Sequence, residues 1–356
     1  MEGGARFWQG KAVLVTGGAS FIGSRLVDSL LAKGAVLIVA DDFSSGRFGN
    51  LEYTLKRNNS GVWTSRNLSV WKGDLKERSF ARSVMKDIDV VFHLAALHGG
   101  RGYIDSHPVQ CCTNMLLDQM VFEETQREGI ERVCFASSAC VYPSYLQIEA
   151  GSGYLLKEED ADPFVRDKAF ADLEYGWAKL MGEMALKAYH RQYGMKTSSV
   201  RIFSAYGPRE NETHAVLALI AKAFTKMDPF AIWGTGEQDR NFTYVDDIVD
   251  AMILAGEKID DGSPVNAGRD DRITLDQAAK LVFDIVGWRP KQIEHDLSGP
   301  EGVVSRAADL TVAKKLLQWA PKVSYEEGFR RTADWYFANN NVDKVRATLS
   351  QRLMER

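Results

Sequence analysis

The feature that most constrains this sequence is a glycine-rich segment that lies between an apolar strand and a helix near the start of the chain. Residues 11–16 (KAVLVT) form a continuous apolar run, which is typical of a strand covered on both faces. Residues 17–23 (GGASFIG) hold three glycines, and the residues after them carry apolar side chains at helical spacing. Glycines at this junction let the backbone approach a pyrophosphate, to which the helix N-terminus offers unpaired N–H groups. We therefore predict a dinucleotide site with contacts from Gly17, Ser20, Phe21, Ile22 and Gly23.

An acidic residue at the end of the second predicted strand indicates which dinucleotide binds. Asp41 follows the run 35–40, about 20 residues after the glycines, where a carboxylate can accept both hydroxyls of the adenine ribose. Arg47 lies nearby and could hold a 2′-phosphate, but the acid favours NAD over NADP. Ser20 occupies the place of the middle glycine, and a plain tight turn with a helix cap is the alternative interpretation. Further cofactor contacts are expected at Asp74 and Leu75 for the adenine edge, and at Leu94, Ala95 and Ala96 for the nicotinamide half.

Strands and helices alternate through the first two thirds of the chain. Strands are expected at 89–94, 132–136 and 197–203 in addition to the first two, with helices between them. This alternation predicts an α/β fold with a Rossmann-type, doubly wound parallel sheet. The predicted domains are an NAD-binding domain with the catalytic residues (1–208), a smaller, mainly substrate-binding C-terminal lobe (209–340) and a charged helical tail (341–356). Residues 1–10 are expected to form a loosely held leader.

Composition excludes several classes of partner. The net charge of −4 favours neither a nucleic-acid nor a membrane partner, and no apolar run reaches the length of a membrane span. The four cysteines lack the spacing of zinc ligands or of a disulfide framework, so we expect no metal site. A reducing, cytoplasmic location is the expectation.

The predicted strand 132–136 runs into small and nucleophilic side chains, among them Ser138 and Cys140. Tyr175 and Lys179 lie one turn apart on one face of the following helix. A nearby cation favours the phenolate, so we expect the pKa of Tyr175 to be lowered toward working pH. Tyr175 is then a candidate base for a sugar hydroxyl whose carbon loses hydride to NAD, although such a spacing by itself also suits a solvated helix face.

These motifs together resemble the extended short-chain dehydrogenase/reductases. The resemblance rests on TGGxxFIG, Asp41, HLAA, SSA and YxxxK, and covers residues from about 11 to 337. The segments RNFTYVDD (240–247) and YGP (206–208) are similar to those of the branch that acts on nucleotide sugars. Within that branch, the chain most resembles the GDP-mannose 3,5-epimerases, through GGRGYI (99–104), ASSACVYP (136–143) and GPEGV (299–303) followed by Arg306.

The resemblance implies a role for each matching residue. Ser138 would hold the 4-hydroxyl of the sugar beside Tyr175, Lys179 would bind the nicotinamide ribose, and Cys140 would be a second acid/base. Oxidation at C4 makes the protons at C3 and C5 removable, so that a thiol and an opposing base can exchange them before the hydride returns. Substrate contacts are expected from Gly100, Arg101, Ser138, Ser204, Arg240 and Arg306, with the last two arginines suited to clamp a diphosphate.

The sequence departs from the epimerase pattern at two positions. No lysine follows YGP until Lys222, and His214 stands nearest to the expected base; His214 could be that base or could simply begin a helix after Thr213. Ser204 stands where the branch commonly has asparagine. His98, which follows HLAAL, could touch the sugar or be structural.

Three enzymatic functions stay open on the sequence. They are an NAD-dependent epimerase acting at C3 or C5 of a nucleotide sugar, a plain 4-epimerase of a UDP- or GDP-linked hexose or uronate, and a net oxidoreductase. A non-catalytic binding module is disfavoured because Ser138, Tyr175 and Lys179 are all present. The resemblance also implies a homodimer through a four-helix bundle. Its apolar contacts would come from Met115, Leu116, Met120, Val121, Leu180, Met181, Met184 and Ala185.

Overall fold

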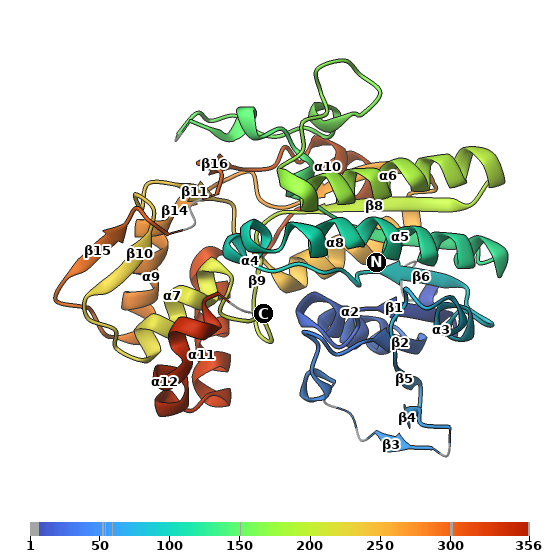
Figure 1. The fold of residues 1–356 in the computed structure, drawn as a ribbon, viewed down its shortest axis with the longest axis horizontal. Helices are drawn as coiled ribbons and strands as arrows, with labels where there is room; N and C mark the ends of the chain where they lie inside the picture. Colours follow the sequence, from blue (N-terminus) through green and yellow to red (C-terminus); the bar gives the residue numbers. More distant parts are fainter. Residues whose placement is uncertain are drawn as a thin grey trace.

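The computed structural model describes residues 7–354, except residues 52, 54, 59, 150, 300 and 301. Its centre is a nine-stranded sheet in the order β13-β8-β7-β6-β1-β2-β5-β4-β3 (Figure 1). The strands are β1 (Ala12–Thr16), β2 (Val36–Asp41), β3 (Lys56–Arg57), β4 (Trp63–Ser65), β5 (Leu68–Lys72), β6 (Val90–His93), β7 (Arg132–Ser138), β8 (Lys196–Ile202) and β13 (Asp261–Ala267). All pairs from β13 to β5 are parallel, and only the edge strands β4 and β3 pair antiparallel. The predicted doubly wound parallel sheet is therefore confirmed.

Helices cover both faces of the sheet, which explains why the central strands β1, β2 and β6 are mainly apolar. These helices are α2 (Phe21–Ala32), α3 (Arg78–Val84), α4 (Arg101–Ser106), α5 (Pro108–Arg127), α6 (Leu173–Tyr193) and α8 (Val245–Lys258). Helix α5 packs along α6 and against α3, and residues of these helices share one buried cluster with Phe135 of β7. Helix α2 packs on α8 and joins the other cluster, which includes Val13 and Val15 of β1.

The second lobe is built from short elements and lies to one side of the sheet (Figure 1). It contains α7 (Ala215–Phe224), β10 (Phe230–Trp233), β11 (Asp239–Arg240), β14 (Ile273–Thr274), α9 (Leu275–Val286), β15 (Ile293–Asp296), β16 (Ser305–Arg306), α11 (Tyr325–Asn339) and α12 (Val342–Arg352). Helix α8 and strand β13 come from the same half of the chain but return to the large sheet. The domain boundary at residue 208 thus stays a prediction, while in space the later half of the chain contributes to both lobes.

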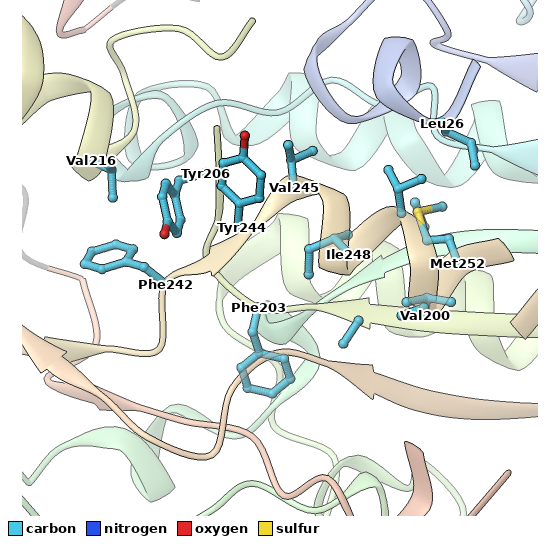
Figure 2. Packing of buried hydrophobic residues seen from close by; sticks show 14 of the residues in the cluster. Leu26, Val200, Phe203, Tyr206, Val216, Phe242, Tyr244, Val245, Ile248 and Met252 are labelled. Atoms are coloured by element: carbon cyan, nitrogen blue, oxygen red, sulfur yellow. The ribbon is translucent and has the colours of Figure 1, made fainter. Parts of the chain in front are cut away.

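A buried cluster joins the two lobes. Figure 2 shows Phe203, Tyr206, Phe242, Tyr244 and Val245 gathered where β8 ends and α8 begins. Strands β9 (Ala205–Tyr206) and β12 (Thr243–Tyr244) pair in parallel at this place. Because aromatic side chains here pack edge to face, the second lobe is held firmly at the C-terminal edge of the sheet.

Both ends of the described chain are packed. Residues 1–6 of the predicted leader lie outside the described residues, but Trp8 is fully buried and donates its indole N–H to Glu257. The expectation of a loose leader is therefore wrong at Trp8, because a large aromatic side chain gains more by burial than a short segment loses by ordering. The predicted tail forms α12, which buries Val345 and Leu349.

Among the described helices, none combines the length and the apolar composition that crossing a bilayer requires.

Candidate active site

A cavity of about 400 Å³ lies at the C-terminal edge of the sheet and is also lined by α7, β10 and the loop before β16. Doubly wound sheets bind ligands at this edge, beside the point where the strand order reverses. The predicted residues on its wall are Ser20, Phe21, Ile22, Leu94, Ala96, Gly100, Arg101, Ser138, Cys140, Tyr175, Lys179, Ser204, His214, Arg240 and Arg306. The predicted residues that are not part of the described lining are Gly17, Gly23, Asp41, Asp74, Leu75 and Ala95. The structure thus gathers the catalytic and substrate-binding candidates in one place, and their roles stay predictions.

The glycine-rich turn fits a closely approaching ligand for steric reasons. Gly17 has a φ of 67°, and a Cβ there would lie 2.9 Å from the backbone nitrogen of Ala95. A Cβ on Gly23 would lie 2.2 Å from the carbonyl oxygen of Gly17, so only glycine lets helix α2 begin this close to the turn. Ser20 is accommodated because its φ is −86°, and its hydroxyl donates to the Gly17 carbonyl at 2.6 Å.

Asp41 is buried at the end of β2 and holds the turn from behind. Its Oδ2 accepts from the Ala19 amide at 2.9 Å and its Oδ1 from the Phe43 amide at 2.8 Å. Arg47 and Asn50 are on the cavity wall next to it. Asp41 therefore shapes the turn whatever its contact with a ribose. Asp74 pairs with Lys76 at 3.3 Å, and its adenine contact stays a prediction.

A chain of buried polar groups supports the floor after β6. The Thr16 hydroxyl accepts from the amides of Leu94 and Ala95 at 3.1 Å each and lies 2.8 Å from His93 Nδ1. His93 Nε2 lies 2.9 Å from Asp118 Oδ1, and burial lowers the pKa of His93, which keeps the ring neutral. Since Thr16 accepts two amide protons, its own proton can go to Nδ1, so that Nε2–H donates to Asp118.

Helix α6 approaches the end of β7 very closely. A Cβ on Gly176 would lie 2.1 Å from the carbonyl oxygen of Cys140, and the Asp172 amide donates to that same oxygen at 2.8 Å. This contact brings Tyr175 to Ser138 and directs Lys179 into the sheet edge. Lys179 Nζ lies 4.5 Å from the centre of the Phe135 ring and 5.9 Å from that of Tyr175.

The expected lowering of the Tyr175 pKa is not found. Burial raises the pKa of Tyr175, Cys140 and Asp118 raise it further, and a hydrogen bond with Ser138 opposes the shift. Burial also lowers the pKa of Lys179, although Asp118 and Glu183 oppose this. The spacing in the sequence shows that Lys179 is near Tyr175, but it does not show that the fold removes water from both side chains. The loss of water disfavours a charge on each of them.

The position of His214 fits both interpretations that the sequence left open, and its role as a base stays a prediction. It directly precedes α7, its side chain makes no capping hydrogen bond with the described residues, and it lines the cavity. Nδ1 lies 3.3 Å from Glu210 Oε1. Burial lowers the pKa of His214 to about 4, which keeps the ring neutral at pH 7, and burial also raises the pKa of Glu210 well above its usual value. The His98 ring lies 6.0 Å from the Tyr175 ring and 6.2 Å from the His214 ring.

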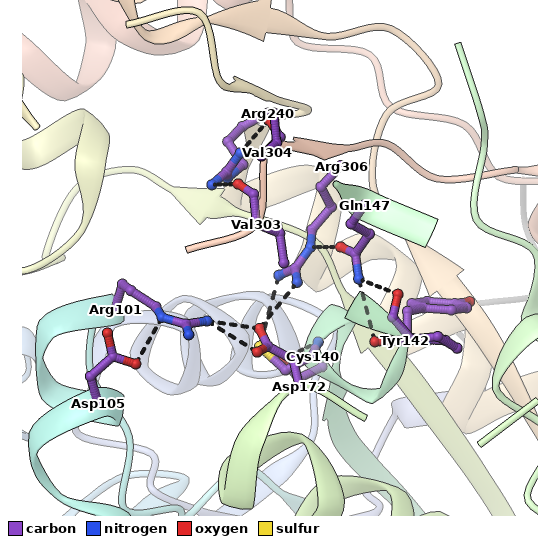
Figure 3. A network of polar contacts seen from close by, with 12 residues as sticks. Arg101, Asp105, Cys140, Tyr142, Gln147, Asp172, Arg240, Val303, Val304 and Arg306 are labelled. Atoms are coloured by element: carbon purple, nitrogen blue, oxygen red, sulfur yellow. Dashed lines mark hydrogen bonds and ion pairs between the residues drawn. The ribbon is translucent and has the colours of Figure 1, made fainter. Parts of the chain in front are cut away.

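Two arginines of the second lobe lie on this part of the wall, with Arg306 beside Cys140 and Arg240 further away (Figure 3). Arg306 Nη1 lies 3.8 Å from Cys140 Sγ, and Arg306 Nε donates to Gln147 Oε1 at 2.5 Å. Arg240 is paired with Arg306 across β11 and β16, but its guanidinium donates to backbone carbonyls of residues 303 and 304. The two predicted diphosphate clamps therefore point to different parts of the cavity, with Arg306 beside Cys140.

Three acidic side chains near these groups were missed by sequence reasoning: Asp118, Asp172 and Glu210. Asp172 bridges Arg101 and Arg306, and Glu210 faces His214. Nothing in the local sequence signals these contacts, because each joins segments far apart in the chain or depends on the path of a loop. Ser204 does reach the cavity and has a φ of 34°. Pro300 and Glu301 of the GPEGV motif lie outside the described residues.

Comparison with known proteins agrees with this geometry. Residues 13–268 match the model of the NAD dependent epimerase/dehydratase family. The chain is 31% identical to GDP-mannose 3,5-epimerase 1 of Oryza sativa subsp. indica, over 91% of this chain and 81% of that protein. It is 34% identical to GDP-mannose 3,5-epimerase of Arabidopsis thaliana, over 77% of this chain and 71% of that protein. The structure of UDP-glucose 4-epimerase with UDP-glucose from Thermotoga maritima is similar, with a TM-score of 0.77, 28% identity, and coverage of 91% of this chain and 98% of that one.

Proposed function

This chain belongs to the NAD-dependent epimerase/dehydratase family, and we propose that it is a nucleotide-sugar epimerase that exchanges protons at C3 or C5 beside a transient C4 ketone, acting on a GDP-hexose. One observation carries the proposal. The cavity that holds Ser138, Tyr175 and Lys179 also holds two further groups able to move protons, Cys140 and His214. A hydride transfer at C4 alone needs only the first three.

The residues of the glycine-rich turn fit NAD. The steric contacts at Gly17 and Gly23 leave a backbone cradle that no larger side chain permits, and Ser20, Phe21 and Ile22 bring the N-terminus of α2 to the cavity wall. Acceptance and return of hydride at C4 is the chemistry that this cofactor supplies when bound.

Tyr175 and Ser138 would handle the proton of the 4-hydroxyl. Their hydrogen bond stabilises the phenolate relative to the phenol, which is the direction that a base requires. Lys179 lies one helical turn further on the same face of α6, where burial lowers its pKa.

Cys140 and His214 would exchange the protons beside the ketone. Neutral His214 is competent to accept a proton at pH 7, since its pKa is about 4. Cys140 Sγ lies 3.8 Å from a guanidinium nitrogen of Arg306 on the same cavity wall. Two acid/base groups on separate segments can act from two sides of a sugar ring, as an inversion requires.

A plain 4-epimerase is the second candidate. The observation that favours it is the similarity to a UDP-glucose 4-epimerase structure over 98% of that chain. In this case Cys140 and His214 would only line the cavity, and the keto sugar would turn over before the hydride returns.

Incubation with GDP-, UDP- and dTDP-hexoses in D2O separates these functions, with the products followed by NMR. Deuterium at C3 or C5 supports the proposal, whereas inversion at C4 without deuterium replaces it by the second candidate. Cys140→Ala and His214→Gln should each suppress deuterium uptake by about 10²-fold or more. Cys112→Ala is the matched control, because Cys112 is an exposed cysteine of α5 outside the cavity.

The apolar side chains that α5 and α6 leave exposed support a homodimer. Met115, Leu116 and Met181 are exposed, whereas Val121 and Leu180 are fully buried within the chain's own core. The predicted bundle would therefore use only part of the apolar set named from the sequence.

All four cysteines are free, and a cytoplasmic location is part of the proposal.

A further inference from the structure

Three charged side chains from three segments meet beside Cys140 (Figure 3). Arg101 begins α4, Asp172 precedes α6, and Arg306 belongs to β16. Arg101 Nη1 donates to both carboxylate oxygens of Asp172, at 3.1 and 3.0 Å. Arg306 Nη2 lies 3.6 Å from Asp172 Oδ2, while Nη1 of the same guanidinium reaches the Cys140 sulfur. The Asp172 carboxylate thus bridges two guanidinium groups on the wall beside a proposed acid/base group.

The charges of this group cancel. Asp105 pairs with Nε of Arg101 at 2.8 Å, so two carboxylates face two guanidinium groups. On the wall near Tyr175, burial disfavours the charged forms of both His214 and Glu210. In the proposed function, Lys179 binds the ribose of the dinucleotide and does not contact the sugar's C6 group. Beside Cys140 the two carboxylates therefore balance Arg101 and Arg306, while Arg240, elsewhere on the wall, donates to the backbone carbonyls of residues 303 and 304.

Resting on the proposed function, we infer that Asp172 sets the substrate class: it admits nucleotide sugars with a neutral hydroxymethyl group at C6 and rejects the corresponding uronates. The carboxylate of a uronate would lose its water in the cavity and would meet the largely buried Asp172. Both guanidinium groups that could neutralise it are already paired with carboxylates. Like charges held together in this way oppose binding strongly.

The cavity wall offers a neutral sugar a hydrogen-bond donor. Arg306 Nη2 is buried and has no hydrogen-bond acceptor among the described residues, since Asp172 Oδ2 is too distant at 3.6 Å. A sugar hydroxyl can accept that N–H without bringing a charge. Asp172 keeps the guanidinium in place through the ion pair, while its own negative charge excludes a second carboxylate.

The test measures binding of two substrate pairs, UDP-glucose with UDP-glucuronate and GDP-mannose with GDP-mannuronate, whose members differ only at C6. Dissociation constants are measured on the NAD-loaded enzyme by quenching of tryptophan fluorescence, since Trp233 lines the cavity. Wild-type enzyme should bind the neutral member of at least one pair roughly tenfold more tightly, or better. Asp172→Asn should shift that ratio by roughly tenfold toward the uronate, because it leaves one guanidinium charge uncompensated.

Two further variants control for shape and for general charge. Asp172→Glu keeps the charge and should keep the preference for the neutral sugar. Asp105→Asn removes a more exposed carboxylate that lies outside the cavity wall, so solvent screens its charge and the ratio should shift toward the uronate by less than about twofold, well below the effect of Asp172→Asn. Arg101→Gln leaves Asp105 and Asp172 with Arg306 as the remaining guanidinium group of this cluster, so it should weaken uronate binding further. This variant tests the same charge argument with the opposite expected shift if Asp172→Asn does not fold.

The outcomes separate this inference from the proposed function. Wild-type enzyme that binds both members of each pair equally, or the uronate better, overturns the role of Asp172. So does a ratio that Asp172→Asn, or Arg101→Gln in its place, leaves unchanged. Absence of epimerisation with every hexose overturns the proposed function instead, and leaves the measured binding ratios as they are.

Discussion

Replacing Gly176 by alanine tests how the site is assembled. Gly176 lies in the first turns of α6, next to Tyr175, and packs against the backbone at Cys140. A Cβ at this position would be 2.1 Å from the Cys140 carbonyl oxygen, and the two atoms would have to separate by about 0.9 Å to reach the shortest contact that real Cβ atoms show, 3.0 Å. The obstacle is backbone, which cannot rotate away as a side chain can.

Two effects of this substitution have opposite signs. In a helix interior, alanine is more favourable than glycine by about 0.8–1.0 kcal/mol, so propensity alone predicts a higher Tm. The steric contact instead pushes α6 away from β7 and lengthens the hydrogen bond from the Asp172 amide to Cys140, which is 2.8 Å long. A displacement near 1 Å between Tyr175 and Ser138 is enough to lower kcat by about 10²-fold. We expect Tm to fall and kcat to fall by about this factor, with NAD binding preserved because the glycine-rich turn lies elsewhere.

The assay combines thermal unfolding, NAD affinity and turnover of the substrate that the D2O panel identifies. Gly49→Ala is the matched control: a Cβ there meets nothing within 4 Å, so Tm and kcat should stay near the wild-type values. A Gly176→Ala protein with higher Tm and wild-type kcat would refute the argument, since it would mean that the close approach of α6 to Cys140 does not position Tyr175.

Three other predictions follow from buried or exposed groups. Glu183 and Arg201 form a fully buried ion pair with hydrogen bonds of 3.0 and 2.8 Å. Glu183→Gln should therefore lower the free energy of unfolding, measured in urea, by about 3–5 kcal/mol, and a decrease below about 1 kcal/mol would contradict the pairing. A base acts when it is deprotonated, and the pKa of His214 is about 4. The rate of proton exchange at C3 or C5 should therefore stay constant from pH 7 to pH 5 and fall only near pH 4. A fall in this rate near pH 6.5 that disappears in His214→Gln would contradict this reasoning. Leu116→Glu, on the exposed face of α5, should shift the mass measured by light scattering from dimer to monomer, whereas Val36→Glu, at an exposed position on β2, should leave the mass unchanged. A Leu116→Glu protein of dimeric mass would exclude this face of α5 as the interface.

Much of the fold could be predicted because its signals are local. The strands predicted at 11–16 and 132–136 were found at β1 and β7, since a strand covered on both faces has to be continuously apolar. The glycine-rich turn was recognisable for a similar reason, because the close contacts at Gly17 and Gly23 exclude any side chain. Trp8 was misjudged because its partner, Glu257, comes from the distant end of α8.

The candidate site divides in the same way. Residue types and spacing brought Tyr175, Lys179 and Cys140 to attention, and the structure places all three on one cavity. The direction of the Tyr175 pKa was predicted wrongly, because the spacing shows a neighbouring cation but does not show how much water the fold removes.

Local sequence signals were enough to predict the parallel sheet, the glycine-rich turn and the candidate groups for proton transfer. These depend on periodicity, on glycine stereochemistry and on helical spacing, which act over a few residues. The tertiary structure alone decided which charges meet. Arg101, Asp172 and Arg306 are separated by 71 residues and more along the chain, and their ion pairs exist only because α4, α6 and β16 converge beside Cys140. Electrostatic interactions act through space and depend on burial, so the choice between a neutral and an acidic sugar is a property of the folded cavity.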